Sequence, residues 1–373
     1  MHALKTKSAA PRRQQGLSLI EILVGVLIGM IGIVVIFQVL AVSEAQKRNT
    51  THGADAQSSG AIGLFALQSD VQHGGYGLGL SGDDQIGCMV DAYNNGAAVK
   101  DVDFPLVPLE IVQGAAGAPD QIRVLYGNSA YFVAARTFTA STGTTKTMDS
   151  AGRAGFDVGD KVVFVGTGAA PQCMLQQITA RPVADPLQLE HVQGGNDFNQ
   201  GGVATAFAPT SGFAYNLGPL PRRNVWQVSN RRLVVSDATF GVGTVIEMAD
   251  GIVDLQAEYG VDANGNGLVE DSEWTTAAPA GANWRNLRAM RVALLARSAQ
   301  WDRAACSPNP QWTSGASGAL ALTNFTMTNA DGTADGFAGC GENPPSPNNW
   351  RRYRYSVYET VIPLRNMIWG TAP

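Results

Sequence analysis

An apolar segment near the N-terminus constrains the fold of this chain more than any other feature. Residues 17–42, LSLIEILVGVLIGMIGIVVIFQVLAV, are 26 residues long and contain a single charged side chain, Glu21. At about 1.5 Å per residue, a helix of this length crosses a bilayer core roughly 30 Å thick. A carboxylate inside such a segment is costly in lipid, so we expect Glu21 to have a function.

The charges before this segment predict its orientation. Lys5, Lys7, Arg12 and Arg13 precede it, and residues 1–16 contain no acid. Because basic flanks stay in the cytoplasm, the short N-terminus is expected there and the rest of the chain beyond the membrane. A cleaved secretory signal would have a shorter apolar core, followed by a cleavage site of small residues. Here the apolar segment is long, and the glycine stands before it.

The sequence QQGLSLIEILVGVLIG resembles the class III leader of type IV pilins and type II secretion pseudopilins. The resemblance implies that a prepilin peptidase cleaves after Gly16 and that the new N-terminal residue, Leu17, is methylated. The family usually has Phe at this position, and apolar replacements occur there. Residues 1–16 would then be a leader peptide, and residues 17–42 a transmembrane helix that later enters a filament core. An ordinary anchor with a stray Glu near the interface is the alternative.

Cleavage would give Glu21 a partner. The free ammonium group of Leu17 would lie about one helical turn away, or on a neighbouring subunit. An ion pair lowers the cost of both charges in an apolar medium and fixes the axial register of packed helices. Gly25 and Gly29 have the four-residue spacing that lets membrane helices approach closely.

Residues 43–75 predict an amphipathic continuation of this helix. They are mostly polar, with a sparse apolar stripe that includes Ile62 and Phe65, and the helix is expected to end near Gly74 and Gly75. The glycines within the segment weaken the helical pattern. The sequence LFALQSDVQHGGYGL is similar to the end of this helix in minor pilins of the PilW type.

Residues 76–373 predict a β-rich globular domain. Short runs rich in Val, Tyr and Phe, such as DQIRVLYG, DKVVFVG, NVWQVSNRRLVVSD, IVDLQAEYGVD, RAMRVALLARS and RYRYSVYETVIPLRN, are separated by turn residues. No helices alternate with these strands, which argues against a doubly wound parallel sheet. The predicted class is α+β: a long N-terminal helix packed on a mainly antiparallel, pilin-like domain. Long loops are expected at residues 137–155, 194–221 and 306–349.

Four cysteines follow the membrane segment: Cys88, Cys173, Cys306 and Cys340. None forms a Cys-x-x-Cys pair, so zinc or redox chemistry is poorly supported. An even number in an exported domain is typical of disulfides. Sequence proximity favours Cys88–Cys173 and Cys306–Cys340, while the other two pairings and buried free thiols stay open.

The stretch DANGNGLVEDSE, residues 262–273, matches the twelve-residue calcium loop. The predicted ligands are Asp262, Asn264, Asn266, the carbonyl of Leu268, Glu270 (directly or through water) and Glu273. Gly267 occupies position six, where the chain turns sharply. The flanking residues are strand-like, so the helices of an EF-hand are not expected. A polar hairpin turn is the alternative, since Asn-Gly pairs favour turns without a metal.

The sequence contains no recognisable catalytic motif. It has no Gly-x-Ser-x-Gly elbow, no His-Glu-x-x-His helix and no phosphate-binding loop, and His191 is the one histidine of the β-rich domain. A net charge of -5 provides no basic field for collecting phosphates. We expect a protein that is not an enzyme and does not bind nucleic acid.

The resemblance extends to GIVDLQAEYG, VALLARS and YRYSVYETVIPLRN near the C-terminus, and it implies a minor pilin of the PilW type. Such a protein lies in the inner membrane, with a periplasmic C-terminal domain, and after assembly near the tip of a pilus that can serve twitching motility. There it primes polymerisation and helps to present a tip component. The implied partners are other minor pilins, the major pilin, the prepilin peptidase, the inner-membrane assembly platform and a large tip adhesin. A type II secretion minor pseudopilin is the first alternative, and a membrane-anchored periplasmic binding protein or hydrolase is the second.

Overall fold

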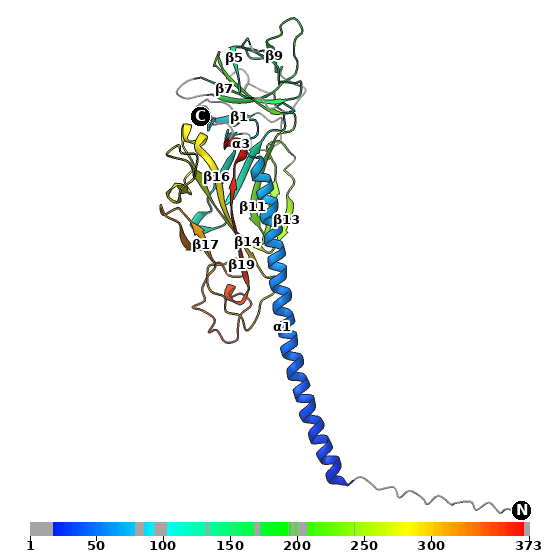
Figure 1. Ribbon diagram of the computed structural model, residues 1–373. Helices are drawn as coiled ribbons and strands as arrows, with labels where there is room; N and C mark the ends of the chain where they lie inside the picture. The colour runs from blue at the N-terminus through cyan, green and yellow to red at the C-terminus, as the bar shows by residue number, and fades with distance from the viewer. Residues whose placement is uncertain are drawn as a thin grey trace, which may run out of the picture. The chain divides into compact units, whose positions relative to one another are not determined.

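The computed structural model describes residues 18–78, 86–92, 103–131, 134–150, 152–167, 172–192, 194, 198–199, 207–241 and 243–368. The chain divides into two compact units, Met1–His52 and Gly53–Pro373. Figure 1 shows the helices and strands of both units. Each unit is considered by itself below.

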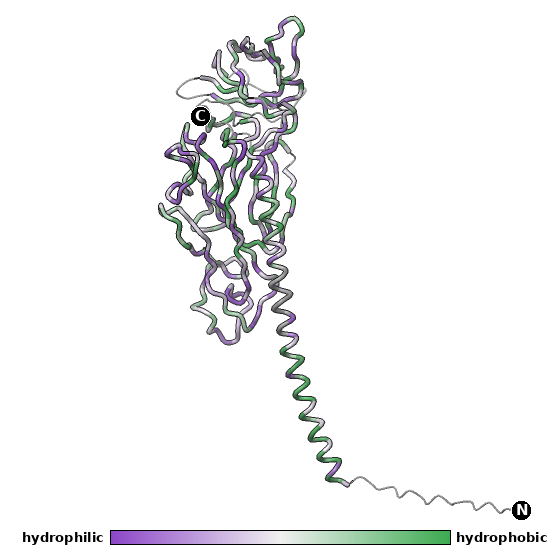
Figure 2. The backbone as a smooth tube through the Cα atoms, in the orientation of Figure 1, coloured by the Kyte–Doolittle hydropathy of each residue, from purple (hydrophilic) through white to green (hydrophobic). Residues whose placement is uncertain are grey.

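Helix α1 (Leu19–His73) begins in the first unit. Its residues Leu19–Glu44 form, among the described residues, the one helical segment long and apolar enough to cross a membrane, and none of that segment is buried. Figure 2 shows apolar residues along this stretch. A helix that is apolar on all sides is typical of one surrounded by lipid or by other helices. The predicted apolar N-terminal helix is confirmed.

The second unit contains an eight-stranded sheet with the spatial order β2-β1-β8-β7-β10-β5-β6-β9. Its strands are β1 (Met89–Ala92), β2 (Asp103–Pro105), β5 (Arg136–Ser141), β6 (Thr145–Met148), β7 (Lys161–Gly166), β8 (Cys173–Gln177), β9 (Gln188–Glu190) and β10 (Gly212–Gly218). Neighbouring strands are antiparallel except β1 and β8, which are parallel. Apolar side chains cover both faces of this sheet.

Two further sheets are entirely antiparallel. The five-stranded sheet has the order β13-β12-β11-β4-β3: β3 (Leu109–Val112), β4 (Gln121–Tyr126), β11 (Arg222–Ser229), β12 (Arg232–Ser236) and β13 (Ile246–Asp250). The four-stranded sheet has the order β15-β14-β16-β19: β14 (Ile252–Val261), β15 (Trp274–Thr275), β16 (Leu287–Arg297) and β19 (Tyr355–Pro363). Strands β17 (Gln311–Ser314) and β18 (Ala321–Asn324) form a separate hairpin. The predicted α+β class is therefore confirmed.

Short helices lie between these strands or, in the case of α3, follow β19. They are η1 (Ala115–Gly117), η2 (Asp271–Glu273), η3 (Gly281–Asn286), η4 (Trp350–Arg352) and α3 (Arg365–Ile368).

The main core lies between the C-terminal part of α1 and the five- and four-stranded sheets. Leu67 and Val71 of α1 are fully buried, together with Val124 of β4 and Leu294 of β16. The helix comes close to β19 at Gly60, where an added Cβ would lie 2.2 Å from the ring of Tyr358. Gly60, one of the glycines that weaken the helical pattern in the sequence, therefore allows α1 to pack closely against β19.

The structure differs from the loop prediction in three places. Residues 137–155 contain most of β5 and all of β6, residues 194–221 contain β10, and residues 306–349 contain the β17–β18 hairpin. These strands are short and rich in Thr, Ser, Gly and Asn, residues that are common in turns, so their composition hid their pairing.

Candidate functional site

The start of α1 is fixed by Ser18. The backbone N–H of Glu21 donates to the carbonyl oxygen of Ser18 at 3.0 Å and to its Oγ at 3.2 Å. Ser is a favoured helix N-cap, and a carboxylate in the first turn interacts favourably with the helix dipole. Glu21 is exposed, and Gly16 and Leu17 lie outside the described residues.

The apolar part of α1 has no packing partner in the described part of the chain. Its large side chains are more than half exposed, or nearly so, and no atom comes within 4 Å of a Cβ built at Gly25, Gly29 or Gly32. These three glycines therefore do not allow a close contact with any other described part of the chain. An apolar surface of this size is typical of a membrane span or of an interface.

The opposite end of α1 is held by the carboxylate of Asp70. It accepts hydrogen bonds from Tyr126 Oη at 2.8 Å, from Asn224 Nδ2 at 2.8 Å and from Trp226 Nε1 at 2.6 Å. The three donors come from β4 and β11. Hydrogen bonds to a carboxylate are stronger than neutral ones, so they fix the rotation of the helix on the sheet.

A side chain from the C-terminal helix caps α1. Asn366 of α3 directs its Nδ2 toward the carbonyl oxygens of His73, at 3.1 Å, and Gly74, at 3.2 Å. The last carbonyl groups of a helix need such partners, because no further turn supplies them. Sequence patterns gave no sign of this contact, which joins residues almost 300 positions apart.

The predicted calcium loop joins β14 to β15 as a hairpin connection. Its ligand candidates Asp262, Asn264, Asn266, Leu268, Glu270 and Glu273 belong to one continuous connection that ends in η2. Their side chains and backbone are linked by hydrogen bonds within the loop. In this loop, as in the rest of the described residues, no group of three or more His, Cys, Asp or Glu side chains is placed to hold a metal ion.

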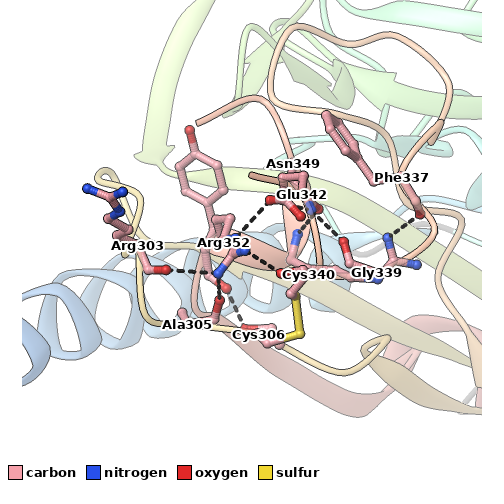
Figure 3. The surroundings of a disulfide bond; sticks show 12 residues. Arg303, Ala305, Cys306, Phe337, Gly339, Cys340, Glu342, Asn349 and Arg352 are labelled. Atoms are coloured by element: carbon pink, nitrogen blue, oxygen red, sulfur yellow. Dashed lines mark hydrogen bonds and ion pairs between the residues drawn. A yellow bond between two sulfur atoms is a disulfide. The ribbon is translucent and has the colours of Figure 1, made fainter. Parts of the chain in front are cut away.

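Both disulfides have the pairing favoured by sequence proximity. Cys88 is bonded to Cys173, and Cys306 is bonded to Cys340. The first joins the start of β1 to β8. Figure 3 shows the surroundings of the second.

The guanidinium of Arg352 lies beside the second disulfide. It donates to the carbonyl oxygen of Cys340 at 2.6 Å, to that of Arg303 at 2.8 Å and to the carboxylate of Glu342 at 2.9 Å (Figure 3). Arg351 pairs with Asp335 close by. Arg351 and Arg352, just before β19, therefore hold the long connection between β16 and β19 in place.

The eight-stranded sheet contains a buried lysine. The sequence did not suggest that this lysine is buried. Lys146 of β6 is fully buried, with its Nζ 3.1 Å from Nε2 of His191 and over the rings of Phe164 and Phe207. Burial lowers the pKa of Lys146 to about 8. Burial, and then the charge of Lys146, lowers the pKa of His191 to about 3. Both side chains are fully buried beside apolar residues of this sheet.

Comparison with known families agrees with these features. Residues 11–37 match the prokaryotic N-terminal methylation motif, and residues 227–366 match type IV pilus-assembly protein W, PilW. The second match runs from β11 to α3, and so includes the four-stranded sheet, the loop of residues 262–273 and the Cys306–Cys340 disulfide. No curated protein and no solved structure matches the chain. The methylation motif at one end and the PilW match at the other together support a pilin of the PilW type.

Proposed function

We propose that this protein is a minor pilin that primes type IV pilus polymerisation and helps to present a component at the pilus tip. Its role is mechanical rather than catalytic. The observation that carries the proposal is the combination of a helix that is apolar on all sides, with Glu21 in its first turn, and a body that grips the far end of the same helix through Asp70.

The helix supports a sequence of steps. Before assembly it anchors the chain in the inner membrane, with the β-rich domain in the periplasm. Cleavage between Gly16 and Leu17 by the prepilin peptidase, followed by methylation of Leu17, places an ammonium group one turn from Glu21. This pair sets the axial register as the helix leaves the assembly platform and packs against other minor pilins and the major pilin. A large tip adhesin is the proposed partner of the β-rich domain.

The test is intact mass spectrometry combined with crosslinking in cells with and without the prepilin peptidase. The expected mature mass is that of residues 17–373 plus one methyl group, with crosslinks from α1 to other pilins that require the peptidase. Glu21→Gln should keep the cleavage and lose the crosslinks. Glu44→Gln, the matched change at the other end of the apolar segment, should keep both.

A mature protein that still begins at Met1 would rule out the pilin role and leave a membrane-anchored periplasmic binding protein. Cleavage with crosslinks to secretion pseudopilins instead of pilus subunits would show a type II secretion role.

A further inference from the structure

The hairpin loop of residues 262–273 begins with a buried carboxylate that is only half satisfied. Asp262 is fully buried. Its Oδ2 accepts hydrogen bonds from the backbone N–H of Gly267 at 3.0 Å and from Nε of Arg288 at 3.3 Å. Its Oδ1 is buried, and no donor in the described part of the chain reaches it. A buried carboxylate oxygen without a partner is costly, and a bound ion or water is the usual explanation.

Hydrogen bonds within the loop fix two of its side-chain amide oxygens. Oδ1 of Asn264 accepts the N–H of Asn266 at 2.9 Å, and Oδ1 of Asn266 accepts the N–H of Leu268 at 2.8 Å. These bonds fix two amide oxygens at alternate positions, as an oxygen-coordinating loop requires. The side chain of Leu268 is itself largely exposed, so only its carbonyl group can contribute.

The last acidic residue closes the loop onto its start. Oε1 of Glu273 accepts the N–H of Ala263 at 2.9 Å, next to Asp262 in the chain. Oε2 of Glu273 accepts the N–H of Glu270 at 2.9 Å. Glu273 is therefore hydrogen-bonded to the residue that follows Asp262, although the two acidic residues lie eleven positions apart in sequence.

The turn itself depends on glycine. Gly267 has a φ of 83°, a conformation that side chains disfavour, and its N–H points at Asp262. A larger residue here would strain the turn that brings the first and sixth positions together.

We propose that residues 262–273 bind a calcium ion, with Oδ1 of Asp262 as the anchoring ligand. Asn264, Asn266, the carbonyl of Leu268, Glu270 and Glu273 supply the other oxygens, directly or through water. Calcium accepts six to eight hard oxygens in flexible geometry, whereas magnesium demands a strict octahedron. Amide and carbonyl oxygens make up half of this set, and carboxylates make up the other half. With three carboxylates the site belongs to the weak class suited to extracellular calcium, about 0.1–1 mM.

The position of the loop gives the ion a structural effect. Asp262 reaches Arg288 of β16, and Glu273 directly precedes Trp274 of β15, which pairs with β14. A bound ion therefore fastens one edge of the four-stranded sheet. This proposal holds whether or not the protein acts in a pilus.

The experiment uses the full chain in detergent micelles, freed of metal with a chelator. Thermal unfolding is followed as CaCl₂ or MgCl₂ is added, and terbium luminescence is excited through Trp274, which adjoins the loop. We expect calcium to raise the melting temperature with half-saturation near about 1 mM, and to displace terbium. Magnesium should do neither at the same concentration.

Glu273→Gln keeps an acceptor for the N–H of Ala263 but removes a charge, and should weaken calcium binding by about tenfold or more. Asn266→Ala, on an exposed side chain, should weaken it without unfolding the chain. Asp271→Asn is the matched control, because it makes the same kind of charge change in the same loop at a position that supplies no ligand. A melting temperature unaffected by about 10 mM calcium, an equal response to magnesium, or equal affinity in Glu273→Gln would overturn the proposal.

Discussion

Trp226 of β11 donates its indole N–H to the carboxylate of Asp70 on α1 at 2.6 Å, across the boundary between sheet and helix. The same carboxylate accepts from two further donors, so one acidic side chain ties the helix to two strands. Such a contact fixes both how deeply the helix sits on the sheet and which of its faces is buried.

Replacing Asp70 by Asn should lower the free energy of unfolding by about 1–3 kcal/mol. The amide NH₂ of the new side chain would replace one carboxylate oxygen. It would then face hydrogen-bond donors of the sheet that now donate to that oxygen. Urea denaturation in detergent measures the change in the free energy of unfolding. A double-mutant cycle with Trp226→Phe gives the coupling energy between Asp70 and Trp226. A coupling below about 0.5 kcal/mol would show that the two residues act independently.

Gly60→Ala should destabilise the protein by about 1 kcal/mol or more, although alanine is the better helix former. The added methyl group would push away the ring of Tyr358, whose hydroxyl donates to the carbonyl oxygen of Gln57 at 2.9 Å. In a Tyr358→Ala background the same change should become stabilising. Gly29→Ala is the control, since no described atom lies near that position.

The Lys146–His191 pair predicts two pH windows. The pKa of His191 falls from 6.5 to about 3 on folding, so the unfolded chain binds more protons between these values, and stability should be lost as the pH falls from about 6.5 toward 3. The pKa of Lys146 falls from 10.5 to about 8, so stability should rise as the pH increases from about 8 to 10.5.

Denaturation at a series of pH values checks both windows. His191→Phe should flatten the acid window, and Lys146→Met should flatten the alkaline one and stabilise the protein at pH 7, because no buried charge remains. If either profile keeps its slope after the substitution, another group is responsible for that window.

Removing the Cys306–Cys340 disulfide should cost about 4 kcal/mol, from the entropy of closing a loop with a sequence separation of 34. The Arg352 contacts remain in a Cys306→Ser/Cys340→Ser variant and hold the folded connection in place, so the effect falls mainly on the unfolded state. Denaturant titration of this variant and the parent gives the difference. A loss under about 1 kcal/mol would mean that the arginine already orders the loop in the unfolded chain.

Features set by local pattern were predictable from the sequence. The apolar helix follows from composition alone, and NVWQVSNRRLVVSD was recognised as strand-forming. The structure divides that run into β11 and β12 at Asn230 and Arg231. Strand β16 was identified although it carries three arginines, because its Arg and apolar residues partly alternate and the resembled family has a strand there. The disulfides followed from proximity, since each cysteine has one near partner in sequence.

Features set by distant contacts were not predictable. Lys146 lies in a core, where lysine is rare, so β6 resembled a solvated loop. Strand β10 contains Asn216, whose side chain is buried against Asp160 at 2.7 Å and was indistinguishable from a turn residue. The proposed calcium loop was recognisable from its spacing, whereas the contact of Asp262 with Arg288, on a different strand, was not.

The contacts of Tyr358 and Asn366 have a consequence for mechanical strength. Tyr358 holds α1 near Gln57, and Asn366 holds it at His73, so β19 and the residues just after it run alongside residues 57–73 in the same direction. A pull along this part of the helix is transmitted to β19 parallel to its length. The nine paired positions between β19 and β16 then resist together in shear, instead of opening one after another from an end. Strand β19 therefore stiffens the part of α1 that lies beside it.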